Sequence, residues 1–161
     1  MTPGWLAHHA SSLFCVNRTD GWRLSGFSLQ GLGKGAGGNG IYLIQTSRAV
    51  VSDIGIAAFA NGLHLNGAWN GGSDDGHGHG SGAIPCMYND FHDLQIGQCG
   101  VGVNVNYSIA NRFHDFVIGA VDTGMCARNA KLALVSLSLC GKSAVHDTAR
   151  FWTHSRARLL C

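Results

Sequence analysis

The chain has 161 residues, of which 12% are charged and 24 are glycine, and its formal net charge is +2. That length suits one domain with a core, and the small net charge without a Lys/Arg run argues against a nucleic-acid partner. No apolar stretch reaches the length of a membrane span and the N-terminus lacks the layout of a signal peptide, so we expect no membrane partner. All nine acidic residues are Asp, which together with abundant Gly and Asn favours short strands and tight turns over long helices.

One phrase recurs along the chain. Its copies are LSGFSLQG from Leu24, VSDIGIAAF from Val51, FHDLQIGQC from Phe91, FHDFVIGAV from Phe113 and LVSLSLCG from Leu134. Each copy has an apolar residue, two intervening positions and then an apolar-x-apolar alternation, which is typical of a strand. A shorter strand opened by glycine follows four of them, at Gly40, Gly62, Gly102 and Gly124, with spacings of 22, 40 and 22 residues.

Units of this length cannot bury their apolar faces alone and become stable by stacking into a solenoid of parallel strands. Stacking predicts four inward columns. They are Val51, Phe91, Phe113 and Leu134; Ile54, Leu94, Phe116 and Leu137; Ile56, Ile96, Ile118 and Leu139; and Ile41, Leu63, Val103 and Met125. Asp53, Asp93 and Asp115 fall where the chain must bend, and we expect their carboxylates to accept backbone hydrogens there.

The wording N-x-F-x-D-[LF]-x-I…G-[VM] over residues 22 to 147 resembles the pectate-lyase-like superfamily, and is similar to β-helix stretches of phage tailspikes and polysaccharide-degrading enzymes. The resemblance implies an all-β fold: a right-handed single-stranded parallel β-helix of about five to six coils of roughly 22 residues. It also implies a polysaccharide partner and an extracellular or virion-associated location. Because one fold hosts many functions, the resemblance is less informative about activity.

We expect a single domain over residues 1–161, with irregular ends at residues 1–21 and 148–161. A solenoid must cap its terminal coils, and neither end looks like a cap. The chain is therefore expected to be a section of a longer β-helix or a homo-oligomer subunit, and tailspikes suggest a trimer.

Two glycine-rich segments, residues 31–40 and 66–85, interrupt the repeat, and such loops often carry function. In the second, two Asp and two His residues lie within six positions, a mixture of ligands that transition metals accept. These residues are Asp74, Asp75, His77 and His79. A divalent cation is thus the candidate cofactor, while the intervening glycines favour a solvated flexible loop as the alternative.

The same loop contains DD and GHGS, which resemble the catalytic Asp pair and Gly-His-Gly of the polygalacturonase-type glycoside hydrolases. This resemblance makes Asp74, Asp75, His77 and His79 the candidate catalytic residues. In that family the two strings lie on separate coils, whereas here they abut, and the Asn-Thr-Asp and Arg-x-Lys elements are missing. Inverting hydrolysis needs carboxyl groups about 6.5 to 9.5 Å apart, which adjacent residues do not guarantee. A lyase would instead use an Arg or Lys base, for which Arg112, Arg128 and Lys131 are available, although nothing in their spacing selects one of them.

The long loop and the outward positions of the repeat supply the candidate substrate-binding residues, since polar and aromatic rows suit sugars. They are Trp69 on the long loop, Tyr42, His64 and Asn104 on one face, and His92, His114 and Arg112 on the other. Strands on a solvated face carry polar residues in any case.

The leading hypothesis is a carbohydrate-directed β-helix: a polysaccharide depolymerase, either lyase or glycoside hydrolase, or a tailspike-like receptor-binding segment. The alternatives are a non-catalytic structural or adhesive solenoid and a loop-borne metal-binding module.

Overall fold

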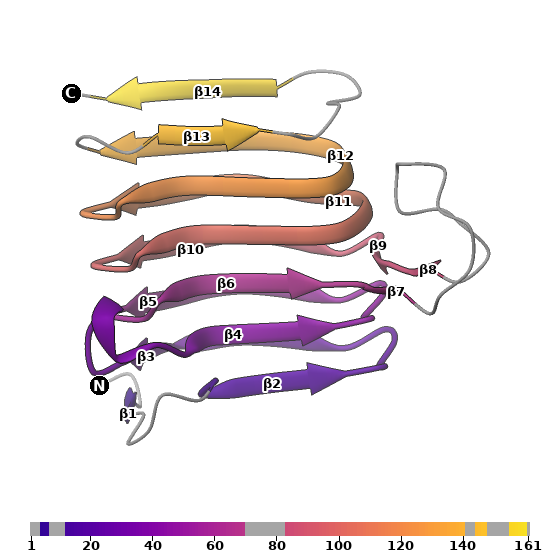
Figure 1. The fold of residues 1–161 in the computed structure, drawn as a ribbon, viewed down its shortest axis with the longest axis horizontal. Coiled ribbons are helices and arrows are strands. Elements are labelled where there is room, and N and C mark those ends of the chain that lie inside the picture. The colour runs from indigo at the N-terminus through magenta and orange to yellow at the C-terminus, as the bar shows by residue number, and fades with distance from the viewer. Residues whose placement is uncertain (1–3, 7–11, 70–82, 141–143, 148–154, 161) are drawn as a thin grey trace.

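The computed structural model describes residues 4–6, 12–69, 83–140, 144–147 and 155–160. The fold is all-β, with 70% of residues in strands and no α-helix among those described. In chain order the elements are β1 (Gly4–Leu6), β2 (Phe14–Asn17), β3 (Arg23–Gln30), the 3-10 turn η1 (Lys34–Ala36), β4 (Asn39–Ile44), β5 (Val50–Ala57), β6 (Asn61–Asn66), β7 (Ala68–Trp69), β8 (Ala83–Ile84), β9 (Cys86–Met87), β10 (Asp90–Gly97), β11 (Val101–Gly119), β12 (Thr123–Cys140), β13 (Ala144–Asp147) and β14 (Ser155–Leu160). Figure 1 shows them stacked in the order of the chain.

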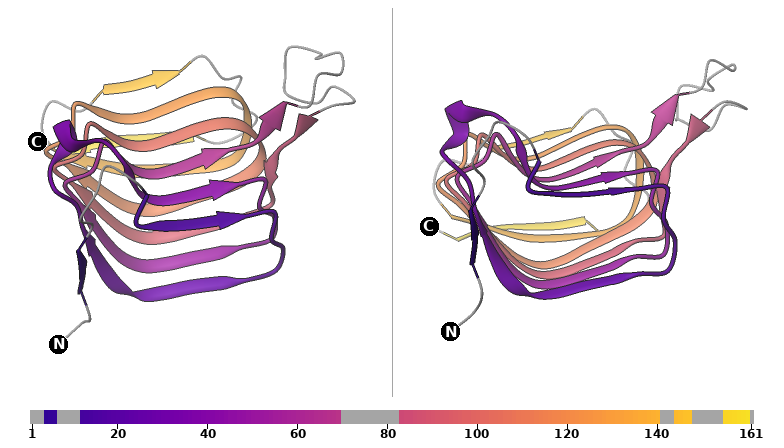
Figure 2. Two further views of the ribbon diagram at one scale, coloured as in Figure 1. Left: turned by 60° about the horizontal axis from the view of Figure 1, so that its bottom comes forward. Right: turned by 90° about the horizontal axis from the view of Figure 1, so that it is seen from below.

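Twelve strands form one parallel sheet that curls through 281° around a common interior (Figure 2). Wall 1 consists of β2, β4 and β6, the first part of β11 and β12, and β13. Wall 2 consists of β3, β5 and β10, the last part of β11 and β12, and β14, with β1 beside β3. Since β11 and β12 each run through both walls, the sheet is solenoid-like, as the repeat predicted.

The inward columns are confirmed for every one of their residues whose side chain is described. Val51, Phe91 and Phe113 pair side by side and are fully buried. The rings of Phe91 and Phe113 stack with centroids 5.0 Å apart. The column of Ile41, Leu63, Val103 and Met125 is likewise in register and fully buried. Like residues stack because neighbouring coils repeat the same inward positions.

Leu134 was placed wrongly in the first column. The register pairs Phe113 with Val135 and pairs Leu134 with Arg112. The cause is a register shift between Phe113 and Phe116: three positions separate these two, but only two separate their partners Val135 and Leu137. The last copy of the phrase therefore has one residue fewer at the bend. The prediction counted back three positions from Leu137, as in the other copies, and so assigned the inward position to Leu134 instead of Val135.

The recurrent glycine at the start of the wall 1 strands is required by close packing. A Cβ on Gly62 would lie 2.6 Å from Cγ2 of Ile96 and 2.8 Å from the Gly102 oxygen. Gly40 and Gly102 meet Ile56 and Ile118 in the same way, at 2.5 and 2.9 Å. The interior is thus narrow at this point, and only glycine lets the two walls approach.

The aspartate positions are bends, as predicted. Asp53, Asp93 and Asp115 have φ of 53°, 53° and 58°, the left-handed region that Asp tolerates better than most residues. The partner of the carboxylates differs from the expectation. Those of Asp93 and Asp115 lie 2.8 and 2.7 Å from Nδ1 of His92 and His114, so a side chain takes the place of the expected backbone N–H.

Regular structure extends beyond the predicted residues 22 to 147. Strand β2 pairs with β4, and β14 pairs with β12, in segments that we expected to be irregular. Phe14 continues the column of Ile41, although no glycine opens its strand. The sheet therefore begins earlier and ends later than the repeat indicated.

One corner of the interior holds a polar ladder. Asn89 and Asn111 are fully buried, and Oδ1 of Asn111 accepts from both the backbone N–H and Nδ2 of Asn89, each at 2.9 Å. Nδ2 of Asn111 donates to the Cys86 carbonyl at 3.0 Å. Asn89 Oδ1 accepts from the backbone N–H of Ala49 at 2.9 Å. These amides join three neighbouring coils, and burying them is tolerated because their polar atoms are paired.

Candidate functional site

The candidate catalytic and metal residues of the long loop, Asp74, Asp75, His77 and His79, lie outside the described residues. The base of the loop is described: Trp69 in β7 pairs antiparallel with Ala83 in β8. The loop therefore leaves the sheet as a short two-stranded ribbon (Figure 1). Its catalytic and metal-binding roles stay predictions.

Tyr42, His64 and Asn104 lie side by side in wall 1, with Cys126 next in register. Their role in substrate binding stays a prediction. The rings of Tyr42 and His64 lie with centroids 4.8 Å apart. Burial lowers the pKa of His64, so its imidazole is neutral at neutral pH. The row presents a mixed aromatic and amide surface to solvent.

The amides of this surface are bonded to one another. Nδ2 of Asn104 donates to Asn61 at 3.1 Å, and Nδ2 of Asn61 donates to Asn39 at 2.8 Å. A second row runs beside it, in which Asn106 donates to Asn66 at 3.3 Å and Asn66 to the Tyr42 hydroxyl at 2.8 Å. We call these residues the amide face. Its hydrogen bonds link coil to coil, so its first role is structural.

His92 and His114 likewise lie side by side on neighbouring strands of wall 2, and their role in substrate binding stays a prediction. The rings of His92 and His114 stack with centroids 5.2 Å apart. Nε2 of His114 lies 3.0 Å from Asp90, which Arg112 approaches at 4.0 Å. The described residues contain no group of three or more His, Cys, Asp or Glu arranged to hold a metal ion. On this surface the carboxylates of Asp90, Asp93 and Asp115 each lie within hydrogen-bond distance of an imidazole nitrogen.

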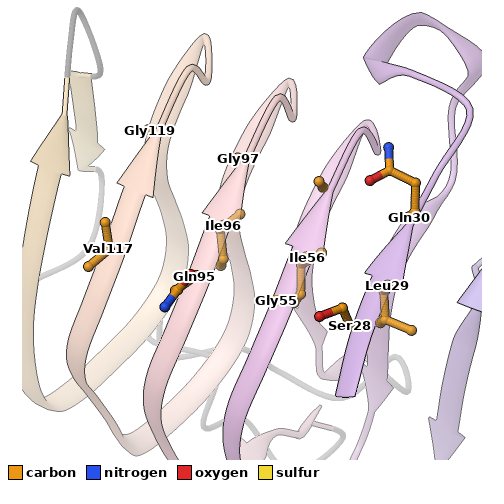
Figure 3. A pocket seen from close by; sticks show the side chains of 11 residues that line it. Ser28, Leu29, Gln30, Gly55, Ile56, Gln95, Ile96, Gly97, Val117 and Gly119 are labelled. Carbon is orange, nitrogen blue, oxygen red and sulfur yellow. The ribbon is translucent and has the colours of Figure 1, made fainter. Parts of the chain in front are cut away.

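A groove that sequence reasoning missed lies on the outside of wall 2, beyond the aspartate bend. It has a cavity volume of about 460 Å³ and opens to solvent. Figure 3 shows it crossing four neighbouring strands, β3, β5, β10 and β11. It is lined by Ser28, Leu29, Gln30, Gly55, Ile56, Ala57, Gln95, Ile96, Gly97, Val117 and Gly119.

The floor of the groove consists of small residues at outward positions: Gly55 and Ala57 on β5, Gly97 on β10 and Gly119 on β11. Side chains with hydrogen-bonding groups come from Ser28, Gln30 and Gln95. The signal in the sequence was this run of small outward residues, which the inward pattern of the repeat obscured.

Packing does not explain the missing side chains at Gly55 and Gly97 of the floor. A Cβ on Gly97 would meet only the Gly119 oxygen, at an ordinary 3.5 Å. One on Gly55 would lie 3.0 Å from the Ser28 hydroxyl, the movable end of a side chain. Glycine at these positions is therefore a feature of the surface, unlike the packed glycines of wall 1.

None of the described residues lining the groove is ionisable. Amide, hydroxyl and backbone groups can orient a polar ligand by donating and accepting hydrogen bonds.

No protein-family model matches the chain, and no curated protein or solved structure matches it either. Among the described residues there is no helix long and apolar enough to cross a membrane. The fold and the groove are therefore the basis for a functional assignment.

Proposed function

We propose that this chain is a saccharide-binding β-solenoid of the receptor-binding or adhesive kind. The observation that carries the proposal is the groove on wall 2, an outward hollow with a small-residue floor and neutral hydrogen-bonding groups along it. Its floor matches the flat C–H face of a sugar ring, while Ser and Gln side chains match the hydroxyl groups at the ring edge.

The proposed fold is a right-handed parallel β-helix of the pectate-lyase-like type. The parallel, in-register pairing of successive coils supports it, and parallel crossover connections are right-handed in about 98% of cases. Association into a homo-oligomer and an extracellular or virion-associated setting belong to the same proposal. Size-exclusion chromatography with light scattering tests the association, and a monodisperse monomer would contradict it.

The test of binding is a glycan array probed with the parent chain and with Gly97→Val. Valine suits an extended strand and fills the groove, so we expect at least a tenfold loss of affinity for the glycans that the parent binds. Gly35→Val is the matched control, because no atom lies within 4 Å of a Cβ added at Gly35 and its φ is ordinary. If the parent binds no glycan, or if Gly97→Val binds as well as the parent, the proposal is wrong.

The depolymerase alternative is tested separately on the same glycans. Incubation with polysaccharide followed by product analysis should show no shortening of the chains if the protein only binds. Cleavage that is lost in Asp74→Asn or Asp75→Asn would instead assign a catalytic role to the long loop.

A further inference from the structure

Two segments of the chain match Asn-x-Ser/Thr, the acceptor motif for N-linked glycans: NRT from Asn17 and NYS from Asn106. The motif is short, so the structural setting decides which copy is a usable acceptor. We infer that Asn17 is an N-glycosylation site and that Asn106 is not. The inference does not depend on saccharide binding by the groove, because the glycan here is attached covalently.

The first motif lies at a surface bend. Asn17 is exposed at the end of β2, and Arg18 and Thr19, which complete the motif, are exposed as well. Among the described strands β2 is the last of wall 1, since it pairs with β4 alone. The chain turns directly after it, with Arg18 at φ 51°. A bulky, hydrated glycan can be accommodated at such a position.

The neighbouring coil fixes the backbone of this motif and leaves the acceptor amide accessible. The N–H of Arg18 donates to the Ile44 carbonyl at 2.9 Å, and the carbonyl of Thr19 accepts from the N–H of Ser47 at 3.0 Å. No hydrogen bond among the described residues involves the side-chain amide of Asn17. Its Nδ2 is therefore available for reaction in the folded chain.

The second motif lies inside the sheet. Asn106 pairs with Asn66 of β6 on one side and with Arg128 of β12 on the other, and its Nδ2 donates to Asn66 at 3.3 Å. Ser108 is fully buried, and its hydroxyl has no hydrogen-bond partner among the described residues. The amide is engaged and the hydroxyl of the motif is closed to solvent, so a transferase cannot use this copy once the chain has folded.

The modification is the transfer of an oligosaccharide from a lipid diphosphate carrier. Nδ2 of Asn17 attacks C1 of the first sugar, so that the C1–Nδ2 bond forms while the C1–O bond to the diphosphate breaks. The lipid diphosphate leaves with the electron pair, and one amide proton passes to a base of the transferase. N-linked glycans belong to secreted proteins, which agrees with the extracellular setting proposed above.

Secretion of the full chain behind a cleavable secretion signal, from cells that carry out N-glycosylation, tests the inference. We expect the secreted protein to be heavier by one glycan. Peptide:N-glycosidase in heavy-oxygen water should then label position 17 alone, because the enzyme converts the glycosylated amide into a carboxylate. Peptide mapping by mass spectrometry locates the label.

Thr19→Ala and Asn17→Gln should both lose the glycan, because each destroys the first motif at an exposed position where folding is unaffected. Ser108→Ala is the matched control: it destroys the second motif, removes a hydroxyl without a described partner and should keep the glycan. An unmodified secreted chain, a glycan on Asn106, or a glycan retained in Thr19→Ala would overturn the inference.

Discussion

Replacing Asn111 by leucine tests how much the buried amide ladder contributes to stability. The substitution removes the acceptor of the Asn89 backbone N–H and the donor of the Cys86 carbonyl. Nδ2 of Asn89 also loses one contact but keeps its bond to the Thr46 carbonyl at 3.1 Å. Two buried groups thus lose a partner in a site that is fully closed to solvent.

The magnitude follows from two opposing effects. A buried polar group left without its partner costs about 1 to 3 kcal/mol, or about 4 kcal/mol for two. The leucine side chain gains about 2 kcal/mol on burial. We therefore expect Asn111→Leu to lower the free energy of unfolding by about 2 kcal/mol.

Urea unfolding followed by circular dichroism measures this change. With a slope of about 2 kcal/mol per molar urea, the midpoint should fall by about 1 M. Asn17→Leu is the control, since Asn17 is exposed at the end of β2 and its replacement should change stability by about 0.5 kcal/mol at most. Equal midpoints for the two variants would refute the importance of the ladder.

Three further predictions concern glycine packing, pH and thiol reactivity. Gly62→Ala should lower the melting temperature because its Cβ would clash with backbone and Ile side chain, whereas Gly97→Ala should leave it nearly unchanged; similar losses would contradict the distinction. Burial lowers the pKa of His64, so stability should fall as the pH drops below about 6.5, where the unfolded chain takes up the proton, and His64→Gln should flatten that dependence in thermal melts at pH 5 to 7. Burial raises the pKa of the Cys86 thiol while Cys15 is exposed, so iodoacetamide with peptide mapping should label Cys15 much faster, and equal labelling would speak against the burial of Cys86.

The stacked core could be predicted from the sequence because an offset of 22 residues, or 40 across the long loop, carries the same position to the next coil. The pairs Phe91 with Phe113 and His92 with His114 follow that rule and were predicted correctly. Leu134 was not, because the last copy omits the residue that bends the chain in the others. One residue fewer in a coil shifts the register between neighbouring strands, and the amino-acid sequence alone does not show where that residue is missing.

The candidate site was harder to predict than the core. Tyr42 and His64 were expected on one face and lie there, yet the amide contacts that tie this face together depend on distances between coils. The groove depends on side chains that are missing, at Gly55 and Gly97, and on knowing that packing does not require them to be glycine. Whether packing requires glycine at a position can be judged only from the positions of the neighbouring atoms.

Titration of the ¹⁵N-labelled chain with a neutral tetrasaccharide, followed by heteronuclear NMR, tests the central claim most directly. The account predicts shifts in the side-chain amides of Gln30 and Gln95 and the backbone amide of Gly97, with the amides of Asn61 and Asn104 unchanged. Shifts confined to Asn61 and Asn104, or no shifts at saturating ligand, would contradict it.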